Sequence, residues 1–440
     1  MRVETTVEDG VWRDIHATVG RILERYLDPA ATAPVIVAFS GGGDSLALLL
    51  AAKTWADRAG RDVRAVTVDH RLRREGADWA LWCRARCAAL GVPHATVVWE
   101  GDKPATGLSA AARAARHALI ADHARSLRAV VVLMGHTADD RLEAAAMRAA
   151  GASVSDPRLW APSPVWPQGR GLFVLRPLLG VRRADIRAAL TACRETWIDD
   201  PGNTDPAQTR ARARLSLAGD PAPPPPDRAT APSSRLFDHV RQGPLGDLAI
   251  DVAVLASAPT DDVRAFVAAA LLCAAGTTRP PRGERLDRLV RLIGDTTPFV
   301  TTLAGARVQS DGVILRFMRD AGEFARRGWV DAAAPIDRPF VFDGRFEIVA
   351  RDPGWSVGPL RGRTSRLSKV ERSSLKAAPP GARAASPVCV SSTGAVTAAA
   401  GIDHPKIAVR CLIMPRLRAA LSVTNCESDV SHMAKTHGMS

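Results

Sequence analysis

The chain has 440 residues, 46% of them hydrophobic and 24% charged, which is the composition of a globular protein with material for two or three domains. Lys and Arg outnumber Asp and Glu by 59 to 46, and this net charge of +13 favours a polyanionic partner, with a generally basic proteome as the alternative. The seven cysteines are odd in number and form no metal-type repeat, so we expect reduced thiols in a cytosolic protein rather than a disulfide framework.

We expect a soluble cytoplasmic protein without membrane association. The first ten residues, MRVETTVEDG, lack the basic-then-apolar layout of a secretory signal. The longest apolar stretch, residues 266–275, is much shorter than the about 20 residues that a helix needs to cross a bilayer.

The first 150 residues alternate between predicted helices and strands. An amphipathic helix over 11–27 precedes a buried strand at 35–37. Further strands are predicted at 63–68, 95–99 and 129–134, and further helices at 44–60, 75–90, 108–126 and 139–149. This alternation predicts βαβ units and an α/β fold with a doubly wound, mostly parallel sheet. Ligands of such sheets bind at the carboxyl ends of the strands, where Gly41, Asp69 and His136 fall.

A glycine loop, SGGGDS at residues 40–45, connects the first strand to the next helix. Successive glycines let backbone N–H groups converge, and the helix that follows adds its unpaired amides and the positive end of its dipole. The loop lacks the Gly-Lys-Ser/Thr ending of a Walker A motif, so no lysine is placed to reach a γ-phosphate. We therefore expect the loop to hold pyrophosphate while the α-phosphate is attacked. The alternative is an ordinary strand-to-helix turn.

The chain is predicted to divide near a proline-rich run. The irregular sequence of residues 151–171 predicts a surface loop, and a helix is expected over 183–193. The prolines of residues 218–234 exclude regular structure there. The predicted parts are a domain that contains the glycine loop, a linker, a helical second domain that ends in a hairpin, and a region of uncertain fold: 1–216, 217–234, 235–325 and 326–440.

The second half of the chain is predicted to be a smaller helical or α+β region. Helices are expected at 261–275 and 283–294, and two Asp-Gly pairs, at 311–312 and 343–344, predict hairpins. A basic stripe crosses the second helix, and nucleic-acid contact and a solvated face are equally good explanations of it. The stripe consists of Arg282, Arg285, Arg288 and Arg291.

Six ordered segments between residues 34 and 214 resemble one family. The glycine loop is similar to the signature of PP-loop ATP pyrophosphatases, and VDHRLR at 68–73 resembles the Val-Asp-His-x-Leu-Arg element of the tRNA(Ile)-lysidine synthetases within that group. The similarity continues through an Ala-rich helix with two arginines, an HTADDRLE segment, an RPLL segment and a DPGNTD segment: 108–117, 136–143, 176–179 and 200–205.

The resemblance implies a fold, a reaction and partners. It also implies that residues 1–216 are the catalytic ATP-binding domain and that residues 235–325 contact tRNA. The fold would be that of the PP-loop, adenine nucleotide alpha hydrolase-like proteins. The reaction would be ligation of free L-lysine to C2 of the wobble cytidine of tRNA(Ile) with a CAU anticodon. It would use ATP and Mg²⁺, pass through an adenylated cytidine, and release AMP and pyrophosphate.

The resemblance also assigns candidate site residues. Arg113 and Arg116 share a helical face and suit a negative charge, while His136 and the carboxylates after it suit proton transfer and Mg²⁺. Capping of a helix is the alternative for those carboxylates. Candidate catalytic residues are Asp44, Arg113, His136, Asp139 and Asp140. Candidate ATP-binding residues are Ser40, Gly41, Gly42, Gly43, Asp44, Ser45, Asp69 and Arg116; Asp44 and Asp139 are candidate Mg²⁺ ligands, and Arg210, Arg212 and Arg214 are candidate tRNA contacts.

Four positions depart from the family's pattern, and their effect is left open. They are His117 in place of Tyr, Arg141 in place of Gln, Ala144 in place of Thr and Gly202 in place of Ser. The alternatives are a tRNA 2-thiolase, an amidotransferase similar to NAD synthetase, and an inactive tRNA-binding descendant. The sequence does not identify the lysine-binding residues, the mode of anticodon reading or the oligomeric state, for which a homodimer is one alternative.

Overall fold

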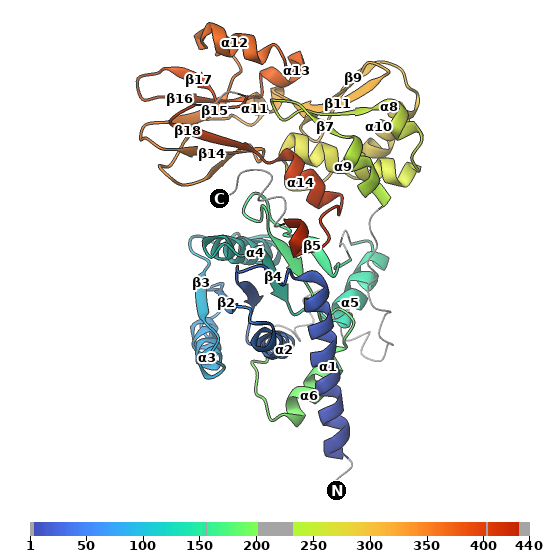
Figure 1. Ribbon diagram of the computed structural model, residues 1–440, viewed down its shortest axis with the longest axis vertical. Coiled ribbons are helices and arrows are strands. Elements are labelled where there is room, and N and C mark those ends of the chain that lie inside the picture. The colour runs from blue at the N-terminus through green and yellow to red at the C-terminus, as the bar shows by residue number, and fades with distance from the viewer. Residues whose placement is uncertain (1–3, 153, 155, 201–231, 402–403, 431–440) are drawn as a thin grey trace. The chain divides into compact units, whose positions relative to one another are not determined.

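The computed structural model describes residues 4–152, 154, 156–200, 232–401 and 404–430 (Figure 1). The chain forms two compact units, residues 1–229 with 424–440 and residues 230–423. The candidate tRNA contacts Arg210, Arg212 and Arg214, the position Gly202 and most of the expected linker lie outside the described residues. The domain boundaries therefore stay a prediction, and the break expected at 325/326 falls inside the second unit.

The first unit is built on a six-stranded sheet in the order β3-β2-β1-β4-β6-β5. Five strands pair in parallel: β1 (Val35–Ala38), β2 (Val63–Asp69), β3 (His94–Val98), β4 (Val131–Met134) and β6 (Phe173–Leu175). The sixth, β5 (Trp160–Pro162), runs antiparallel to β6. The chain steps outward from β1 to β3 and then returns to β4 on the other side of β1. The point where a doubly wound sheet reverses direction therefore lies between β1 and β4, and the predicted α/β fold is confirmed.

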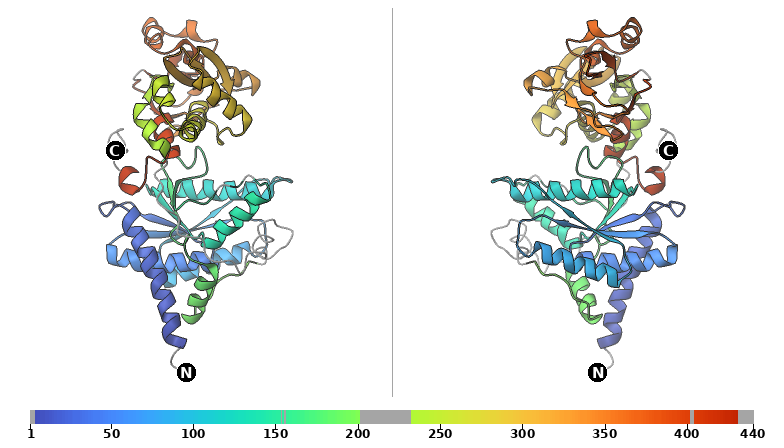
Figure 2. Two further views of the ribbon diagram at one scale, coloured as in Figure 1. Left: turned by 90° about the vertical axis from the view of Figure 1, so that its right-hand side faces the viewer. Right: turned by 90° about the vertical axis from the view of Figure 1, so that its left-hand side faces the viewer.

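Helices cover both faces of this sheet (Figure 2). They are α1 (Glu4–Tyr26), α2 (Gly43–Ala59), α3 (Gly76–Ala89), α4 (Leu108–Ser126), α5 (Ala138–Ala149) and α6 (Arg183–Ala192). Within β1, Val35 and Val37 join a core shared with α1, α2, α3 and α6, whereas Ile36 joins the core under α4. Because both faces of β1 are buried, its sequence begins with three consecutive β-branched residues and does not alternate between apolar and polar side chains.

The irregular stretch at 151–171 contains one element that its sequence does not predict. Trp160 of β5 stacks on Phe173 at 5.0 Å between ring centroids and on Tyr26 at 5.8 Å. Its indole N–H donates to the carbonyl of Thr424 at 3.0 Å. The strand is therefore fixed by tertiary packing of one aromatic side chain rather than by a local pattern.

The second unit contains three antiparallel sheets and short helices. The largest sheet has the order β7-β8-β11-β10-β9, and the others have the orders β12-β15-β16-β17 and β13-β14-β18. The strands are β7 (Arg241–Gln242), β8 (Leu248–Asp251), β9 (Phe299–Leu303), β10 (Ala306–Ser310), β11 (Ile314–Arg319), β12 (Ala332–Ala333), β13 (Phe340–Phe342), β14 (Phe346–Ala350), β15 (Ser356–Pro359), β16 (Pro387–Val390), β17 (Val396–Ala398) and β18 (Ile407–Cys411). The helices are η2 (Pro232–His239), α8 (Val252–Ala256), α9 (Thr260–Ala275), α10 (Glu284–Gly294), α11 (Gly322–Arg326), η3 (Thr364–Arg366), α12 (Lys369–Leu375), α13 (Pro380–Arg383) and α14 (Ile413–Ala420).

Both predicted hairpins of the second unit are confirmed. Asp311 and Gly312 connect β10 to β11, and the Asp311 carboxylate accepts from the N–H groups of Val313 and Ile314. Asp343 and Gly344 connect β13 to β14 and both have positive φ. This is the geometry that Asp-Gly pairs favour.

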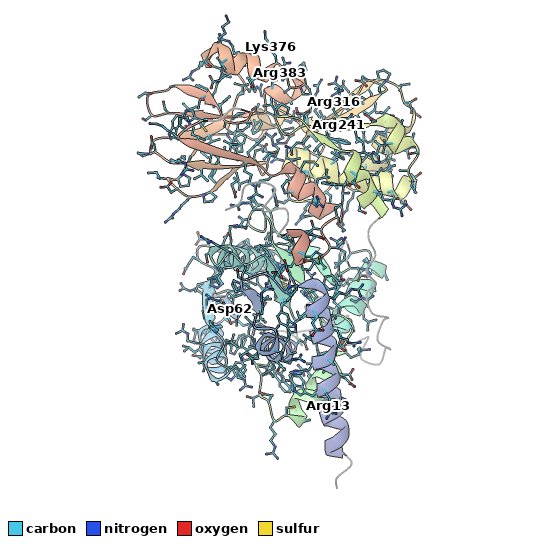
Figure 3. The ribbon with its side chains drawn as sticks, in the orientation of Figure 1. Arg13, Asp62, Arg241, Arg316, Lys376 and Arg383 are labelled. Carbon is cyan, nitrogen blue, oxygen red and sulfur yellow. The ribbon has the colours of Figure 1, made fainter. Side chains whose placement is uncertain are left out.

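Two charged side chains of the second unit that Figure 3 labels, Arg241 and Arg383, have partners nearby. Arg241 pairs with Asp251 at 2.6 Å, and Arg383 donates to the carbonyl of Lys376 at 3.2 Å. On α10, Leu286, Leu289 and Ile293 are buried. The four arginines of the basic stripe are exposed, and the first of them precedes the helix, which begins at Glu284. The exposure of these arginines fits both nucleic-acid contact and a solvated face. None of the described helices combines the length and apolar character of a membrane span.

Candidate functional site

The glycine loop leaves the carboxyl end of β1 in a conformation that glycine alone adopts easily. Gly41 has φ of +84°, and a Cβ added there would lie 2.4 Å from Cδ1 of Ile198 and 3.0 Å from Sγ of Cys83. The Gly41 carbonyl accepts from the N–H of Ile198 at 2.9 Å. The loop is thus clamped on one side by residues 197–198, while Ser40 is exposed and Gly42 is half-buried. Both positive φ and close packing require glycine at position 41.

Hydroxyl groups hold the other end of the loop. Ser45 Oγ donates to the carbonyl of Gly42 at 2.8 Å and accepts from the N–H of Ser40 at 3.3 Å. The two serine hydroxyls lie 3.1 Å apart. Because Gly42 is the N-cap of α2, the first amides of that helix border the loop. Such amides, together with the helix dipole, favour an anion there.

The loop that follows β4 packs directly against the start of α2. A Cβ at Gly135 would lie 3.0 Å from the carbonyl oxygen of Asp44 and 3.1 Å from the N–H nitrogen of Ser45. Gly135 therefore allows the backbone after β4 to approach the glycine loop. This brings His136 and the first turn of α5 to the reversal point of the sheet.

A cluster of four carboxylates lies at this point, and we call it the carboxylate cluster. Its members are Asp44 from α2 and Asp139, Asp140 and Glu143 from α5. Arg183, from the start of α6, donates through Nε to Asp44 at 2.9 Å, through Nη1 to Glu143 at 3.2 Å and through Nη2 to Asp140 at 3.5 Å. The three arms of one guanidinium thus contact three carboxylates.

Asp139 and Asp140 also make structural contacts. Asp139 accepts from the backbone N–H of Arg183 at 2.7 Å and from the Arg182 side chain at 3.1 Å, which fastens the beginning of α6. Asp140 accepts from the N–H of Thr137 at 2.8 Å in the capping box of α5. The helix-capping alternative thus describes part of what these carboxylates do.

The same contacts decide whether Asp44 and Asp139 could be ligands of Mg²⁺. Oδ2 of Asp44 is the atom that accepts from Arg183 Nε, and both oxygens of Asp139 are used by the start of α6. In the described part of the chain, no group of three or more His, Cys, Asp or Glu side chains has the arrangement of a metal site. The residues present do not fit a protein-held Mg²⁺ at Asp44 and Asp139, because an ion would compete with arginine for the same oxygens.

A second cluster, of histidines and arginines, lies beside the carboxylates. Burial lowers the pKa of His136 well below its ordinary value, Asp140 opposes that effect, and Arg176, Arg116 and Arg113 add to it. Arg176 Nε donates to His136 Nδ1 at 3.1 Å. Since Nδ1 accepts, the proton of the neutral imidazole is placed on Nε2, which makes His136 a donor at its other nitrogen.

Arg113 and Arg116 lie on α4 close enough to add positive charge to this cluster. Burial lowers the pKa of His117 to about 2, and Arg116 and Arg113 lower it further. Burial also lowers the pKa of Arg176 to about 10, again with Arg113 adding to the effect. The guanidinium groups that lower the pKa values of Arg176 and His117 concentrate positive charge here, which a bound anion would offset.

The chain is similar in sequence to known proteins that contain a PP-loop domain. A model of the PP-loop domain matches residues 15–220. A tRNA(Ile)-lysidine synthase of Caulobacter vibrioides is 46% identical over 413 residues, which cover 92% of this chain and 97% of that protein. The chain belongs to the tRNA(Ile)-lysidine synthase family. Another member, from Hyphomonas neptunium, is 38% identical over 307 residues, which cover 66% of this chain and 82% of that protein.

Solved structures are less similar. The U34-tRNA thiolase NcsA of Methanococcus maripaludis superposes with a TM-score of 0.39 at 14% identity, covering 47% of this chain and 73% of that one. NMN synthetase of Francisella tularensis gives a TM-score of 0.32 at 11% identity, covering 49% and 88%.

Within this member of the lysidine synthase family, the glycine loop, Asp69 and His136 fall at the ends of the neighbouring strands β1, β2 and β4, whereas Arg113 and Arg116 lie on α4. Asp69 lies at the end of β2, where its carboxylate accepts from the N–H of Arg71 at 2.8 Å. The sequence alone did not single out Arg176, Arg183 or Ile198 as site residues. The signal for the two arginines was their place in the RPLL segment and the helix after it, whereas nothing local marks Ile198.

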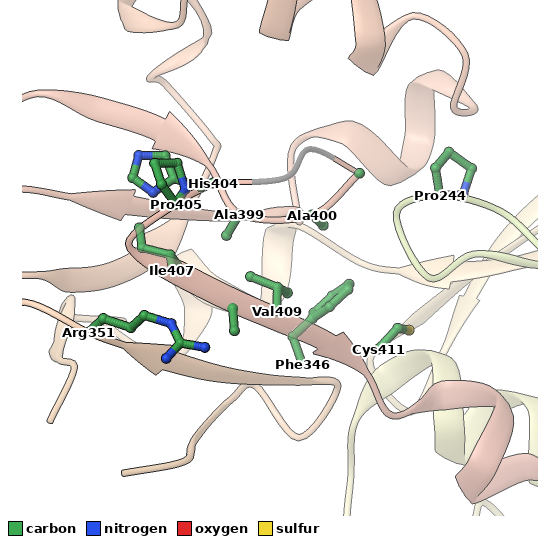
Figure 4. A pocket seen from close by; sticks show the side chains of 12 residues that line it. Pro244, Phe346, Arg351, Ala399, Ala400, His404, Pro405, Ile407, Val409 and Cys411 are labelled. Carbon is green, nitrogen blue, oxygen red and sulfur yellow. The ribbon is translucent and has the colours of Figure 1, made fainter. Parts of the chain in front are cut away.

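One pocket in the second unit contains none of these residues. It has a volume of about 570 Å³ and is lined by residues that include Phe346, Arg351, His404 and Cys411 (Figure 4). The glycine loop and both charged clusters lie in the first unit, so this pocket is not part of the candidate site.

Proposed function

We propose that this chain ligates L-lysine to C2 of the wobble cytidine of tRNA(Ile) with a CAU anticodon, using ATP. The observation that carries the proposal is similarity to a tRNA(Ile)-lysidine synthase over 92% of this chain and 97% of that relative. The likeness thus includes the second unit as well as the PP-loop domain. The net charge of +13 suits an RNA substrate.

The first step is adenylation of the cytidine. O2 of the base attacks the α-phosphorus of ATP, and pyrophosphate leaves. In this proposal the amides of the glycine loop and of the first turn of α2 hold the leaving pyrophosphate, with Ser40 to Ser45 around it and Asp69 and Arg116 towards the rest of the nucleotide. Fixed donors aimed at developing charge are an effective form of catalysis.

The second step forms the C–N bond. The ε-amine of lysine attacks C2, the bond from C2 to O2 breaks, AMP leaves with that oxygen, and the nitrogen loses a proton. Lysine must react as the neutral amine although its ordinary pKa is about 10.4, so a base or desolvation is needed. Arg113 would stabilise the negative charge of the leaving AMP.

Asp140 suits the role of base better than His136. Burial raises the pKa of Asp140, but His136, Arg183 and hydrogen bonds from Thr137 outweigh burial and hold that pKa below its ordinary value, so the carboxylate is ionised. His136 accepts from Arg176 at Nδ1 and would instead orient a substrate group through Nε2. Asp44 borders the glycine loop, and burial raises the pKa of its carboxyl despite Arg183.

Mg²⁺ is proposed as a counter-ion that accompanies ATP, and not as an ion held by Asp44 and Asp139. Arg210, Arg212 and Arg214 remain proposed tRNA contacts. Cytoplasmic localisation is likewise part of the proposal.

The cysteines argue against the thiolase alternative. Cys83 and Cys87 belong to the core of the first unit, and burial raises their pKa values to about 11 and about 12. A thiol with such a pKa is a poor nucleophile at neutral pH.

The test is incorporation of labelled lysine into bulk tRNA. We expect incorporation only when ATP is present, and loss of incorporation in Asp44→Ala. A folded protein that incorporates no lysine while it hydrolyses ATP would favour another PP-loop activity. Absence of both reactions would favour an inactive tRNA-binding descendant.

A further inference from the structure

The contacts of the Arg183 side chain could not be predicted from the amino-acid sequence. Its Nε, Nη1 and Nη2 atoms each contact a different carboxylate, and these carboxylates come from two helices. Its own backbone N–H contacts a fourth, Asp139. A lysine could not replace it, because a single ammonium is a point charge and lacks the planar fork that reaches three groups at once.

The carboxylate cluster needs a cation at this place. The side chains of Glu143, Asp140 and Asp44 are 3%, 18% and 23% exposed, so solvent screens their mutual repulsion poorly. Like charges packed in this way raise one another's pKa unless a positive group lies among them. Arg183, itself 14% exposed, supplies that charge.

The alternative to an arginine would be a divalent ion held by the same oxygens. Carboxylate oxygens are ordinary ligands of Mg²⁺ and Mn²⁺. Oδ2 of Asp44, which borders the glycine loop, is already held by Arg183 at 2.9 Å. Two cations cannot share that oxygen at contact distance without strong repulsion.

We propose that Arg183 is the resident counter-cation of the carboxylate cluster: it takes the place of a protein-bound divalent ion and positions Asp44 beside the glycine loop. The protein without nucleotide then binds no divalent ion at this cluster. The inference concerns the first unit alone and does not depend on the identity of the RNA or the amino acid.

The positioning role has a readout that general destabilisation would not reproduce. In Arg183→Met, we expect ATP-dependent pyrophosphate release with tRNA to fall by about 100-fold, roughly 2.7 kcal/mol. Added guanidinium at millimolar concentration should restore part of the rate, whereas urea should not. No restoration in a variant that folds normally would contradict positioning through the guanidinium.

The control for this substitution is Arg86→Met. Arg86 pairs with Glu195 in the same unit and its side chain is 25% exposed, but it contacts no member of the carboxylate cluster in the described structure. We expect near-normal pyrophosphate release from this variant and no effect of guanidinium.

The decisive test is Mn²⁺ binding to nucleotide-free protein, followed by electron paramagnetic resonance. Wild type and Arg86→Met should bind no stoichiometric Mn²⁺, and Arg183→Met should gain one site at least about tenfold tighter, a change of roughly 1.4 kcal/mol. Should Arg183→Met not fold, Arg183→Met/Glu143→Gln removes one repelling carboxylate, and its site should be weaker but measurable. Stoichiometric Mn²⁺ in wild type that Asp44→Asn abolishes would overturn the proposal, as would a folded Arg183 variant that gains no site. Neither result bears on lysine ligation.

Discussion

At the scale of single residues, the site depends on positions that accept glycine and no larger residue. Gly41 combines φ of +84° with a space already filled by Ile198, and Gly135 allows two backbones to meet. The sequence predicted a special loop because three glycines follow a buried strand. It could not predict Ile198 as the group above the loop, since that contact joins residues more than 150 positions apart.

Gly41→Ala tests the loop against a matched glycine. Gly60 also has positive φ, but a Cβ there would meet nothing within 4 Å. We expect Gly60→Ala to cost about 1 kcal/mol of unfolding free energy, and Gly41→Ala to cost about 1–3 kcal/mol more and to abolish lysine ligation. Urea denaturation measures the difference. Equal losses of stability would show that the contact with Ile198 does not constrain the loop.

His117 makes stability depend on pH. Its pKa is about 2 in the folded protein, against about 6.5 when unfolded, because of burial first and of Arg116 and Arg113 second. Between those values the unfolded chain binds a proton that the native protein does not, so stability falls as the pH is lowered. His117→Leu should remove up to about 1.4 kcal/mol per pH unit from the slope of unfolding free energy at pH 4.5–6. An unchanged slope would contradict a neutral, buried His117.

At the scale of elements, the first unit follows its sequence closely, as do two helices and two hairpins of the second unit, whereas the last strands of the second unit do not. The helix expected at 108–126 is α4 with the same bounds, because an Ala- and Arg-rich stretch has strong intrinsic helix propensity. By contrast, β16, β17 and β18 lie where the sequence shows little periodicity. Strand β18 pairs with β14, about sixty residues earlier, so its partner rather than its own pattern defines it.

The start of α6 depends on Asp139. Its carboxylate accepts from the backbone N–H of Arg183 at 2.7 Å and from Arg182, so Asp139→Asn should lower stability by about 1–2 kcal/mol. Hydrogen exchange should quicken for amides in the first turn of α6. The control is Asp185→Asn, an exposed acidic residue in the same turn, for which we expect a change within about 0.5 kcal/mol. Similar exchange in both variants would show that Asp139 does not anchor the helix.

At the scale of the whole molecule, the chain leaves the first unit and returns to it. Residues 424–430 belong to the first unit, where Glu427 accepts from both Nη atoms of Arg61 at 2.6 and 3.1 Å and from the N–H of Asp28 at 2.8 Å. The Arg61 and Glu427 side chains are 5% and 1% exposed. No local pattern could predict this contact, because its partners are 366 residues apart.

Loss of that ion pair should be costly. Glu427→Gln leaves Arg61 buried with a neutral partner, and we expect the unfolding free energy to fall by about 3 kcal/mol. The control is Asp57→Asn, which breaks an exposed pair with Lys53 and should change stability by less than about 0.5 kcal/mol. Thermal unfolding at several salt concentrations measures both variants. Equal melting temperatures for Glu427→Gln and wild type would show that the returning segment is dispensable for the first unit.

The measurement that tests the account most directly is the fate of ATP labelled at its α-phosphorus, in a reaction with tRNA and lysine. A loop that holds pyrophosphate predicts labelled AMP in equal amount to lysine incorporated, with Gly41→Ala producing neither. Labelled ADP as the product would contradict the account, because it would mean that the γ-phosphate, and not the α-phosphate, is the one attacked.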